Sequence, residues 1–599
     1  MKFFLSGNEA IAFGLIQGGA RFITGYPGTP SSEIIPTAVD IKSRLGLNGY
    51  FEWSVNEKVA LEEALSASFA GIDSAVTFKQ VGLNAAMDPF MSAALTGNVG
   101  GFVIVSADDP GPHSSQTEQD SRFLAFFAKI PVLDPSTPKE AYQFASDAID
   151  LSKKYSIPVM LRTTTRISHS REDIEVGKIG NAAIDAAFKK DPNRFAATPH
   201  FRYLLHKALN EKIEQIRLNN KPRLFFEGDI LIITSGITYA YIYDIIKKYR
   251  LENRVKIAKF DMPYPINADA LQKIIDVHKK IVVIEDSYPV LEMQIKNREN
   301  VLSRMNGDMP NEGEYTYDVC EDVLNKLGVL EKQQFAHFTP PPFIRPSLCA
   351  GCGHRSAFFA IREVFKDDAI YTGDIGCYTL GLNLNAVDTV HCMGASISFG
   401  FGLSKAYKLA GKFKHVVATI GDSTFFHSGI PALIDAVHNR VPIVVVILDN
   451  STTAMTGNQK TAADNEDSYG EIAHSVKIKN IVKSIGIEFL KEEDAYNVKS
   501  SKKMLEKAKE YVENNDLPAV LILSHPCIYE KQNLKTNIKI RVEIDHELCK
   551  GCKLCIDNFE CPALIFNNDS KKVEIDRSVC IDCGECIYAC PFGAIEEKK

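Results

Sequence analysis

The sequence predicts an α/β protein with three parallel-sheet domains, followed by a small α+β domain that is rich in cysteine. From the first residues to about residue 530, short apolar segments alternate with segments of helical periodicity. This alternation is typical of parallel sheets whose strands are connected by helices. Beyond residue 540 it gives way to two closely spaced runs of cysteines, which predict a different kind of domain.

Composition and charge exclude some classes of function. The chain has 599 residues, 45% of them hydrophobic, and a net charge of -7 without a lysine-arginine block. This balance predicts several buried cores and argues against a nucleic-acid or anionic-membrane surface. The longest apolar run, Val441–Leu448, is far short of the roughly 20 residues of a membrane span, and the apolar start is interrupted at Ser6, too early for a signal peptide. With fourteen mostly clustered cysteines, a reducing cytoplasmic location is expected.

The alternation also suggests domain boundaries. In the second domain the predicted strands are 229–234, 255–261 and 280–286, and no site residues stand out there, which favours a scaffolding role. The prolines at 340–342 and Pro346 predict a stiff boundary before the third domain. The predicted domains are residues 1–190, 225–338, 339–530 and 541–599, with a polar helical linker at 191–224.

The C-terminal cysteines follow the C-x2-C-x2-C pattern twice, each time with a later Cys-Pro. Thiolates are soft ligands that suit iron-sulfur clusters, and in this pattern three cysteines hold one cluster while the fourth reaches the other. Disulfides or structural zinc fit two such triplets less well. A short bulge is expected at Ile556–Glu560, where the first copy has five residues instead of three. The predicted ligands are Cys549, Cys552, Cys555 and Cys590 for one 4Fe-4S cluster, and Cys561, Cys580, Cys583 and Cys586 for the other.

A second motif, Gly421-Asp422-Ser423, follows a predicted strand, and Asp449-Asn450 follows the next one. This pair resembles the diphosphate-binding motif of thiamine diphosphate enzymes. The resemblance implies that Asp422, Asn450 and the carbonyl of Thr452 hold Mg2+, which prefers oxygen ligands, and that Gly421 lets the backbone approach the phosphates. The stretch Met393-Gly394 to Gly400 resembles the loop that walls the cofactor in that family, although a glycine-rich helix start has the same appearance.

The first domain carries candidates for the rest of such a site. Glu57, placed before a small-residue helix and a strand, resembles the glutamate that binds the aminopyrimidine ring of thiamine. The loop around Thr29 resembles the Tyr-Pro-x-Thr-Pro-Ser loop of 2-oxoacid:ferredoxin oxidoreductases, where the threonine lies near the substrate. A loop at residues 113–122 resembles a substrate-facing loop of the same family, and from it His113 and Arg122 are expected to orient a 2-oxo acid. A tight turn and a solvated loop remain alternative readings of these two segments.

A further group of cysteines is separate from the tail. Cys349, Cys352, Cys377 and Cys527 resemble the ligands of a third 4Fe-4S cluster in pyruvate-type relatives. Isolated buried cysteines are common, and nothing in the sequence brings Cys527 near the other three. Both interpretations stay open at this stage.

These motifs occur in one order over nearly the whole chain, which resembles the thiamine diphosphate-dependent 2-oxoacid:ferredoxin oxidoreductase family. The stretch 421–457 is especially close to members that act on aryl 2-oxo acids such as indolepyruvate and phenylpyruvate. The resemblance implies coenzyme A as co-substrate, ferredoxin as electron acceptor, a beta subunit and a dimer of heterodimers. A family member with another substrate preference, a non-redox thiamine diphosphate decarboxylase and a pure electron-transfer adaptor are the alternatives.

Overall fold

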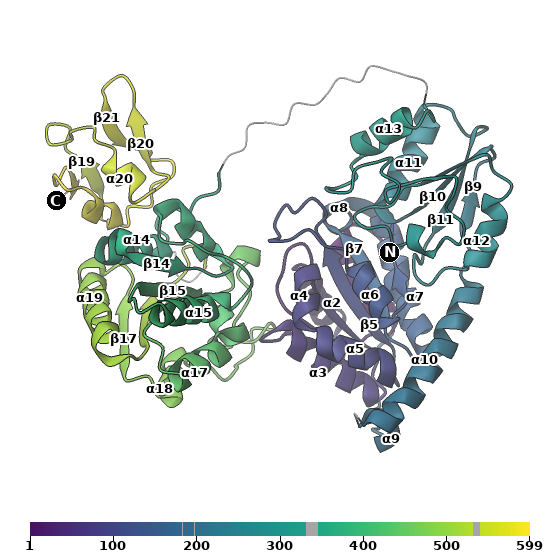
Figure 1. Cartoon of the computed structure of the whole chain (residues 1–599), viewed down its shortest axis with the longest axis horizontal. Helices are drawn as coiled ribbons and strands as arrows, with labels where there is room; N and C mark the ends of the chain where they lie inside the picture. Colours follow the sequence, from purple (N-terminus) through teal and green to yellow (C-terminus); the bar gives the residue numbers. More distant parts are fainter. Residues whose placement is uncertain (182–183, 197, 331–344, 531–539, 599) are drawn as a thin grey trace. The chain divides into compact units, whose positions relative to one another are not determined.

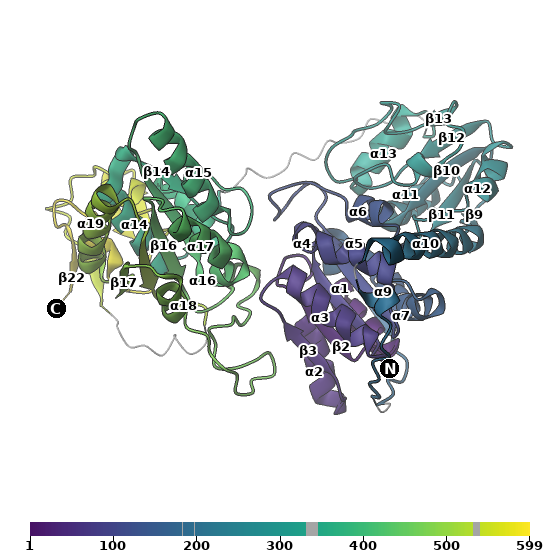
Figure 2. The same ribbon diagram turned by 60° about the horizontal axis from the view of Figure 1, so that its bottom comes forward.

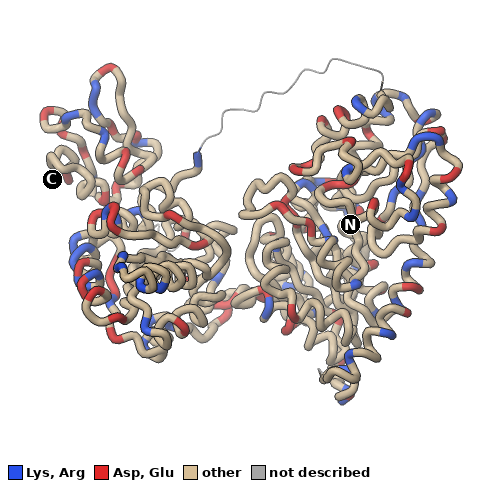
Figure 3. The backbone as a smooth tube through the Cα atoms, viewed as in Figure 1, with Lys and Arg blue, Asp and Glu red and all other residues tan. Residues whose placement is uncertain are grey.

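A computed structural model describes residues 1–181, 184–196, 198–330, 345–530 and 540–598. The chain divides into two compact units, Met1–Phe338 and Thr339–Lys599, which are described separately below (Figure 1). The proline run 340–342, predicted as a domain boundary, lies outside the described residues. Lys and Arg are interspersed with Asp and Glu along both units (Figure 3). None of the helices in the described part of the chain is both long and apolar enough to cross a bilayer.

The first sheet of unit 1 has six parallel strands. Its central strands are entirely buried runs of mostly apolar residues, as expected for a parallel sheet covered on both faces. Helices α1 (Gly7–Gln17) and α7 (Pro138–Tyr155) pack against each other, and α3 (Glu57–Phe69) contacts β2 and β4. The strand order is β3 (Tyr50–Trp53), β2 (Phe22–Gly25), β4 (Ser74–Lys79), β5 (Phe102–Asp108), β7 (Val159–Thr164) and β6 (Val132–Leu133).

The second sheet of unit 1 has five strands, of which only β9 is antiparallel. Helices α11 (Gly236–Lys248) and α13 (Tyr317–Lys326) share one core with the sheet, whereas α12 (Ala268–Ile275) belongs to a core of other strand residues. The strand order is β13 (Val301–Leu302), β12 (Lys280–Val283), β10 (Ile230–Ser235), β11 (Val255–Phe260) and β9 (Arg223–Phe225).

Between these sheets runs a long helix, α10 (Pro199–Asn219), preceded by the short helix α9 (Pro192–Phe195). Leu209 and Ile216 of α10 are buried in the core of the first sheet, and Asn220, just beyond the helix, donates to carbonyls of the second domain. The stretch expected as a helical linker is therefore helical, and it packs on the first domain while it leads to the second.

The sheet of unit 2 has five parallel strands. Helices α14 (Gly353–Phe365) and α19 (Val498–Asn515) lie on one face, with α15 (Ala395–Leu409), α17 (Ile430–His438) and α18 (Ile478–Ile485) on the other (Figure 2). The strand order is β14 (Ala369–Thr372), β15 (His415–Gly421), β16 (Val444–Asp449), β18 (Ala519–Ser524) and β17 (Phe489–Asp494).

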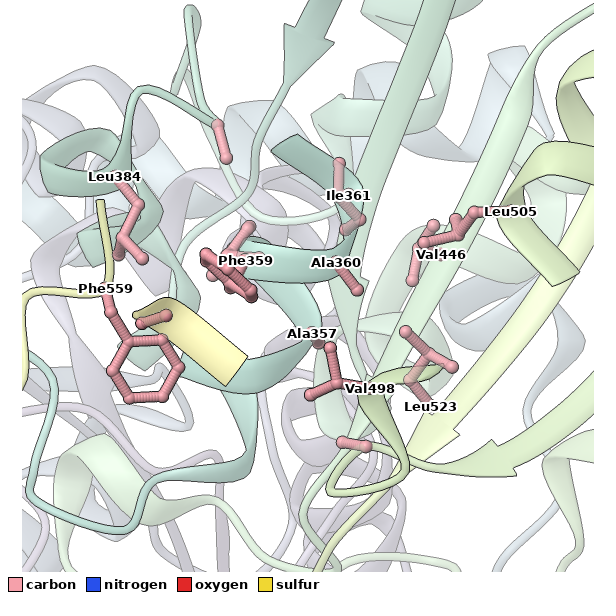
Figure 4. Close-up of a cluster of buried hydrophobic side chains, with 14 of the residues drawn as sticks. Ala357, Phe359, Ala360, Ile361, Leu384, Val446, Val498, Leu505, Leu523 and Phe559 are labelled. Carbon is pink, nitrogen blue, oxygen red and sulfur yellow. The ribbon is translucent and has the colours of Figure 1, made fainter. Parts of the chain in front are cut away.

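The C-terminal domain consists of two small antiparallel pairs, β19 (Val542–Ile544) with β22 (Ile595–Glu597) and β20 (Leu564–Asn567) with β21 (Lys572–Ile575). The five-residue spacing expected to form a bulge instead anchors this domain. After the short helix α20 (Leu554–Asp557), the buried Phe559 packs edge-on against Phe359 of α14, with ring centroids 5.5 Å apart (Figure 4). Arg355 of α14 donates to the Phe559 carbonyl over 2.7 Å, so the extra residues join the two domains of unit 2.

Candidate functional site

Three predicted magnesium ligands converge at the carboxyl edge of the unit 2 sheet. Asp422 follows β15 and Asn450 follows the neighbouring strand β16, so parallel pairing brings them together. With the side-chain amide of Asn450 oriented so that its nitrogen faces the other two residues, this nitrogen donates to the Thr452 carbonyl over 2.8 Å and to Asp422 Oδ1 over 3.3 Å. All three residues are buried, with exposures of 2%, 8% and 3% in chain order.

The electrostatics of Asp422 fit a bound cation. Burial, and next the neighbouring Asp449, hold the pKa of the Asp422 carboxyl well above its usual range. Its Oδ2 atom is buried and has no hydrogen-bond partner among the described residues. A divalent cation would offset both costs, because it pairs with the carboxylate oxygens and stabilises their charge. These oxygens therefore fit Mg2+.

The predicted cofactor-wall loop is hydrogen-bonded to a carboxylate that the sequence motifs did not indicate as a site residue. Asp374, which follows β14, accepts from the backbone N–H groups of Gly394 at 2.8 Å and Ser396 at 3.1 Å. Gly394 has a φ of +83°, and a Cβ there would lie 2.2 Å from Ser428 Oγ, so only glycine fits. The Asp374 carboxyl is buried and its pKa is raised to about 6. The position of Asp374 two residues after Thr372, at the end of a strand, is the sequence feature that could have indicated a site residue.

Two cavities in the C-terminal domain separate its eight cysteines into the predicted fours. The smaller is lined by Cys549, Cys552, Cys555 and Cys590. The larger is lined by Cys561, Cys580, Cys583 and Cys586. Burial raises the pKa of Cys555 to about 11, helped by Cys590, Cys552 and Cys549. A raised pKa keeps such a thiol neutral, and binding of an iron-sulfur cluster would require its deprotonation to the thiolate.

The remaining group of cysteines, at positions 349, 352, 377 and 527, is coupled electrostatically through the Cys377 thiol. Burial raises the pKa of the Cys377 thiol to about 12, and the thiols of Cys352, Cys527 and Cys349 contribute in that order. Cys527 follows β18, and its backbone N–H donates to the Asn450 carbonyl over 3.0 Å. The fold thus places Cys527, which the sequence left isolated, beside Asn450 and near enough to Cys377 to act on its thiol. Cys352 also lines the larger cysteine cavity.

In unit 1, Glu57 and Thr29 lie at the carboxyl edge of the first sheet. Glu57 is the first residue of α3, capped by Asn56, and is 6% exposed. Its side chain packs against Gly82 of α4 (Gln80–Ala85): a Cβ at Gly82 would lie 2.5 Å from Glu57 Oε1. Thr29 follows β2, and its carbonyl accepts from Ser114 Oγ over 3.4 Å. The Thr29 loop therefore contacts the loop that carries His113.

The structure gives Arg122 a role different from the expected one. Its side chain is fully buried and binds Asp120 at 2.6 Å and Glu285 at 3.3 Å, so the guanidinium is already paired and is not open to a substrate carboxylate. Glu285 belongs to the second domain, and Arg122 therefore joins two domains. His113 is half exposed, and its Nε2 lies 3.2 Å from Glu314 Oε2.

Three family models match the chain. The description "Thiamine pyrophosphate enzyme, C-terminal TPP binding domain" covers residues 374–523, "Pyruvate flavodoxin/ferredoxin oxidoreductase, thiamine diP-bdg" covers 13–214, and "4Fe-4S dicluster domain" covers 541–591. Together with the three α/β sheets and the cysteine cavities, they define an iron-sulfur enzyme of the thiamine diphosphate-dependent 2-oxoacid:ferredoxin oxidoreductase class. This confirms the predicted fold class and enzyme class.

Curated relatives are more specific. The chain is 38% identical over 636 residues to the indolepyruvate oxidoreductase subunit IorA of Thermococcus kodakarensis, covering 99% of this chain and 97% of that protein. It is 39% identical over 625 residues to IorA of Archaeoglobus fulgidus, with 100% and 98% covered. The chain belongs to the IorA family of indolepyruvate oxidoreductase subunits.

Proposed function

We propose that this chain is the catalytic subunit of an indolepyruvate:ferredoxin oxidoreductase. It converts an aryl 2-oxo acid, such as indolepyruvate or phenylpyruvate, and coenzyme A to the aryl-acetyl-CoA, CO2 and a proton, while two ferredoxins each take one electron. The similarity to IorA proteins over the full chain carries this proposal. The buried oxygen cluster and the three cysteine groups within unit 2 support it.

The chain's own residues would hold the cofactor. Asp422, Asn450 and Thr452 would bind Mg2+, with Gly421 and Ser423 at the diphosphate and the Met393-Gly394 loop as a wall. Glu57 would bind the aminopyrimidine ring, and Thr29 and His113 would face the substrate. Thiamine diphosphate, when bound, supplies the chemistry of decarboxylation, and the protein positions the substrate and excludes water.

Electrons would leave through cysteine-bound 4Fe-4S clusters. The two cavities of the C-terminal domain would each hold one, with the ligand sets predicted above. Cys349, Cys352, Cys377 and Cys527 would hold a third, a proposal supported by the mutual influence of their thiols on their pKa values and by the contact of Cys527 with Asn450. Since Cys352 also lines the larger cavity, this third cluster would pass electrons to the C-terminal pair.

Two protein partners complete the proposal. The curated relatives are named as subunits, which supports a partner subunit. We propose that this partner is a beta subunit and that the assembly is a dimer of heterodimers. Ferredoxin would be the electron acceptor. We likewise propose that the enzyme binds Mg2+, uses coenzyme A as co-substrate and prefers aryl 2-oxo acids.

The decisive experiment is anaerobic turnover by the assembled enzyme with coenzyme A and a low-potential dye as acceptor. Indolepyruvate and phenylpyruvate are expected to be used in preference to pyruvate and 2-oxoglutarate. Equal or preferred use of pyruvate would contradict the aryl assignment. Aldehyde release without an acceptor would indicate a non-redox decarboxylase, and failure to bind thiamine diphosphate and Mg2+ would indicate an electron-transfer adaptor.

A further inference from the structure

Lys79 ends strand β4 at the carboxyl edge of the first sheet, between two loops that carry predicted site residues. Its side chain lies against Gly28, one residue before Thr29: a Cβ at Gly28 would be 3.0 Å from Lys79 Cβ and 3.7 Å from its Cδ. On the other side its Nζ donates to the Ser114 carbonyl over 2.6 Å. Only 9% of Lys79 is exposed, so a positive charge is buried beside the Thr29 loop.

This charge is only partly neutralised by the protein. The second partner of the Lys79 ammonium, Ser114 Oγ, is 3.4 Å away, and no carboxylate oxygen of the described residues lies within ion-pair distance. Asp109 acts on it through space. The Asp109 carboxylate is itself occupied by three other hydroxyl and backbone donors at 2.7 to 2.8 Å: Ser114 N–H, Ser115 Oγ and Thr165 Oγ1. A buried ammonium bound mainly to a carbonyl gains strongly from an added anion.

The other cations near this edge of the sheet are already paired. Arg122 binds Asp120 at 2.6 Å, Arg162 binds Asp108 at 2.9 Å and Arg166 binds Glu314 at 2.6 Å. Among these four side chains of the described structure, Lys79 is the one whose ammonium has no bonded carboxylate. It is therefore the candidate for the carboxylate-binding role that the sequence assigned to Arg122.

We propose that the Lys79 ammonium binds the carboxylate of the 2-oxo acid beside Thr29. The proposal rests on the proposed function, because it assigns a residue to the substrate of that reaction. Ser114, which bonds both Lys79 and the Thr29 carbonyl, would hold the ammonium in place until the substrate arrives. Lys79 is thus a binding residue, and the carboxylate is the feature of the substrate that it recognises.

The test uses two ligands that the enzyme cannot decarboxylate, 3-phenyllactate and its neutral counterpart 3-phenyllactamide. Binding of each to the holoenzyme is measured by calorimetry for the wild type and for Lys79→Met, which keeps the apolar stem but loses the charge. Loss of a charge-assisted hydrogen bond is expected to raise the Kd of phenyllactate by about 10-fold to 100-fold. The Kd of phenyllactamide is expected to change by less than about 2-fold, since the amide carries no charge.

Lys153→Met is the matched control. It also removes one positive charge from unit 1, but Lys153 is 48% exposed and pairs with Asp73 at the surface, so both Kd values should stay as in the wild type. If Lys79→Met weakens both ligands equally, or neither, the proposal is overturned. If the acid and the amide are distinguished through Lys79 but the enzyme oxidises no aryl 2-oxo acid, the proposed function fails and the binding site stands.

A measurement on the wild type alone covers the case in which Lys79→Met does not fold. Burial lowers the pKa of Lys79 to about 8, partly offset by Asp109. Binding needs the protonated form, so the preference for phenyllactate over phenyllactamide should be full well below pH 8 and decline as the pH rises through it. The other charged groups that face this position are Asp109, whose pKa stays below its usual value, and the neighbouring His113, which pairs with Glu314. A preference that persists unchanged well above pH 8 would contradict the proposal.

Discussion

At the scale of single residues, two glycines determine how closely neighbouring side chains can pack in the candidate site, because a glycine has no Cβ. Gly82 leaves room for the Glu57 carboxylate, whose Oε1 would lie 2.5 Å from a Cβ at that position. Gly421 leaves room for Tyr378, whose ring would lie 2.1 Å from a Cβ there. A side chain at either position would have to displace a buried neighbour in a packed interior.

The change Gly82→Ala tests this point. The added methyl group is expected to push the Glu57 carboxylate out of place and weaken the affinity for thiamine diphosphate by at least about tenfold, while alanine favours the helix by about 1 kcal/mol. Calorimetric titration with thiamine diphosphate and Mg2+ would measure the affinity, and a thermal scan would show that Tm is little changed. Gly180→Ala, where a Cβ meets nothing within 4 Å, is the control, and equal behaviour of the two variants would refute the steric argument.

At the scale of elements, a buried ion-pair network connects the two domains of unit 1. Arg122 from the start of α6 (Ser121–Ala128) and Arg162 from β7 face carboxylates of both domains, including Asp134, Glu285 and Asp286. Burial raises the pKa of Glu285 to about 7 and that of Asp286 to about 6, although the arginines lower both. Removing one arginine leaves buried carboxylates without a partner, which costs far more than the pair contributes.

Arg122→Met is therefore expected to lower the free energy of unfolding by about 3 to 5 kcal/mol. Chemical denaturation followed by circular dichroism would measure it. Arg44→Met removes an exposed arginine from an i,i+4 pair with Asp40 and should cost less than about 1 kcal/mol. If Arg122→Met left the stability unchanged and raised the KM for the 2-oxo acid, the result would support the substrate-binding role first predicted for Arg122 and contradict the structural role.

At the scale of the whole molecule, both units place their site residues at the carboxyl edges of parallel sheets. In unit 2 the consecutive strands β14, β15, β16 and β18 present Asp374, Asp422, Asn450 and Cys527 at the same edge. Parallel pairing makes this unavoidable, since all strands end on the same side. This edge thereby places Asn450 beside Cys527, and Cys352, from the same proposed ligand group as Cys527, lines the larger cavity of the C-terminal domain.

Cys527→Ser tests the third cluster. If Cys349, Cys352, Cys377 and Cys527 hold one, anaerobically purified enzyme should lose about four iron and four sulfide per chain, while the C-terminal pair remains. Iron and sulfide analysis, with electron paramagnetic resonance of the reduced protein, would measure this. Cys320→Ser, which changes a buried cysteine in the core of the second domain of unit 1, should leave the iron content unchanged. Wild-type enzyme with only eight iron atoms would rule out the third cluster.

Local patterns in the sequence were sufficient for much of this protein. The α/β class follows from buried apolar runs such as Phe102–Val105 and Val444–Leu448, because parallel strands covered on both faces are mostly apolar. The grouping of the eight C-terminal cysteines into two fours could be predicted from their short spacing in the chain. The approach of Asp422 to Asn450 could be predicted because both follow adjacent parallel strands. Residues that are close in sequence, or that follow adjacent parallel strands, can therefore be grouped from the sequence alone.

Only the tertiary structure decided what happens to residues whose neighbours come from distant segments. A loop sequence shows the charge of Arg122 but not that Asp120 and Glu285 already neutralise it, and it shows Lys79 as the polar end of a strand without revealing the burial of its ammonium. Cys527 lies beside Asn450 because β18 pairs with β16, and the motif around Cys527 does not contain this pairing. The physical reason is that burial and charge pairing are set by all surrounding elements at once, whereas a sequence motif records only one of them.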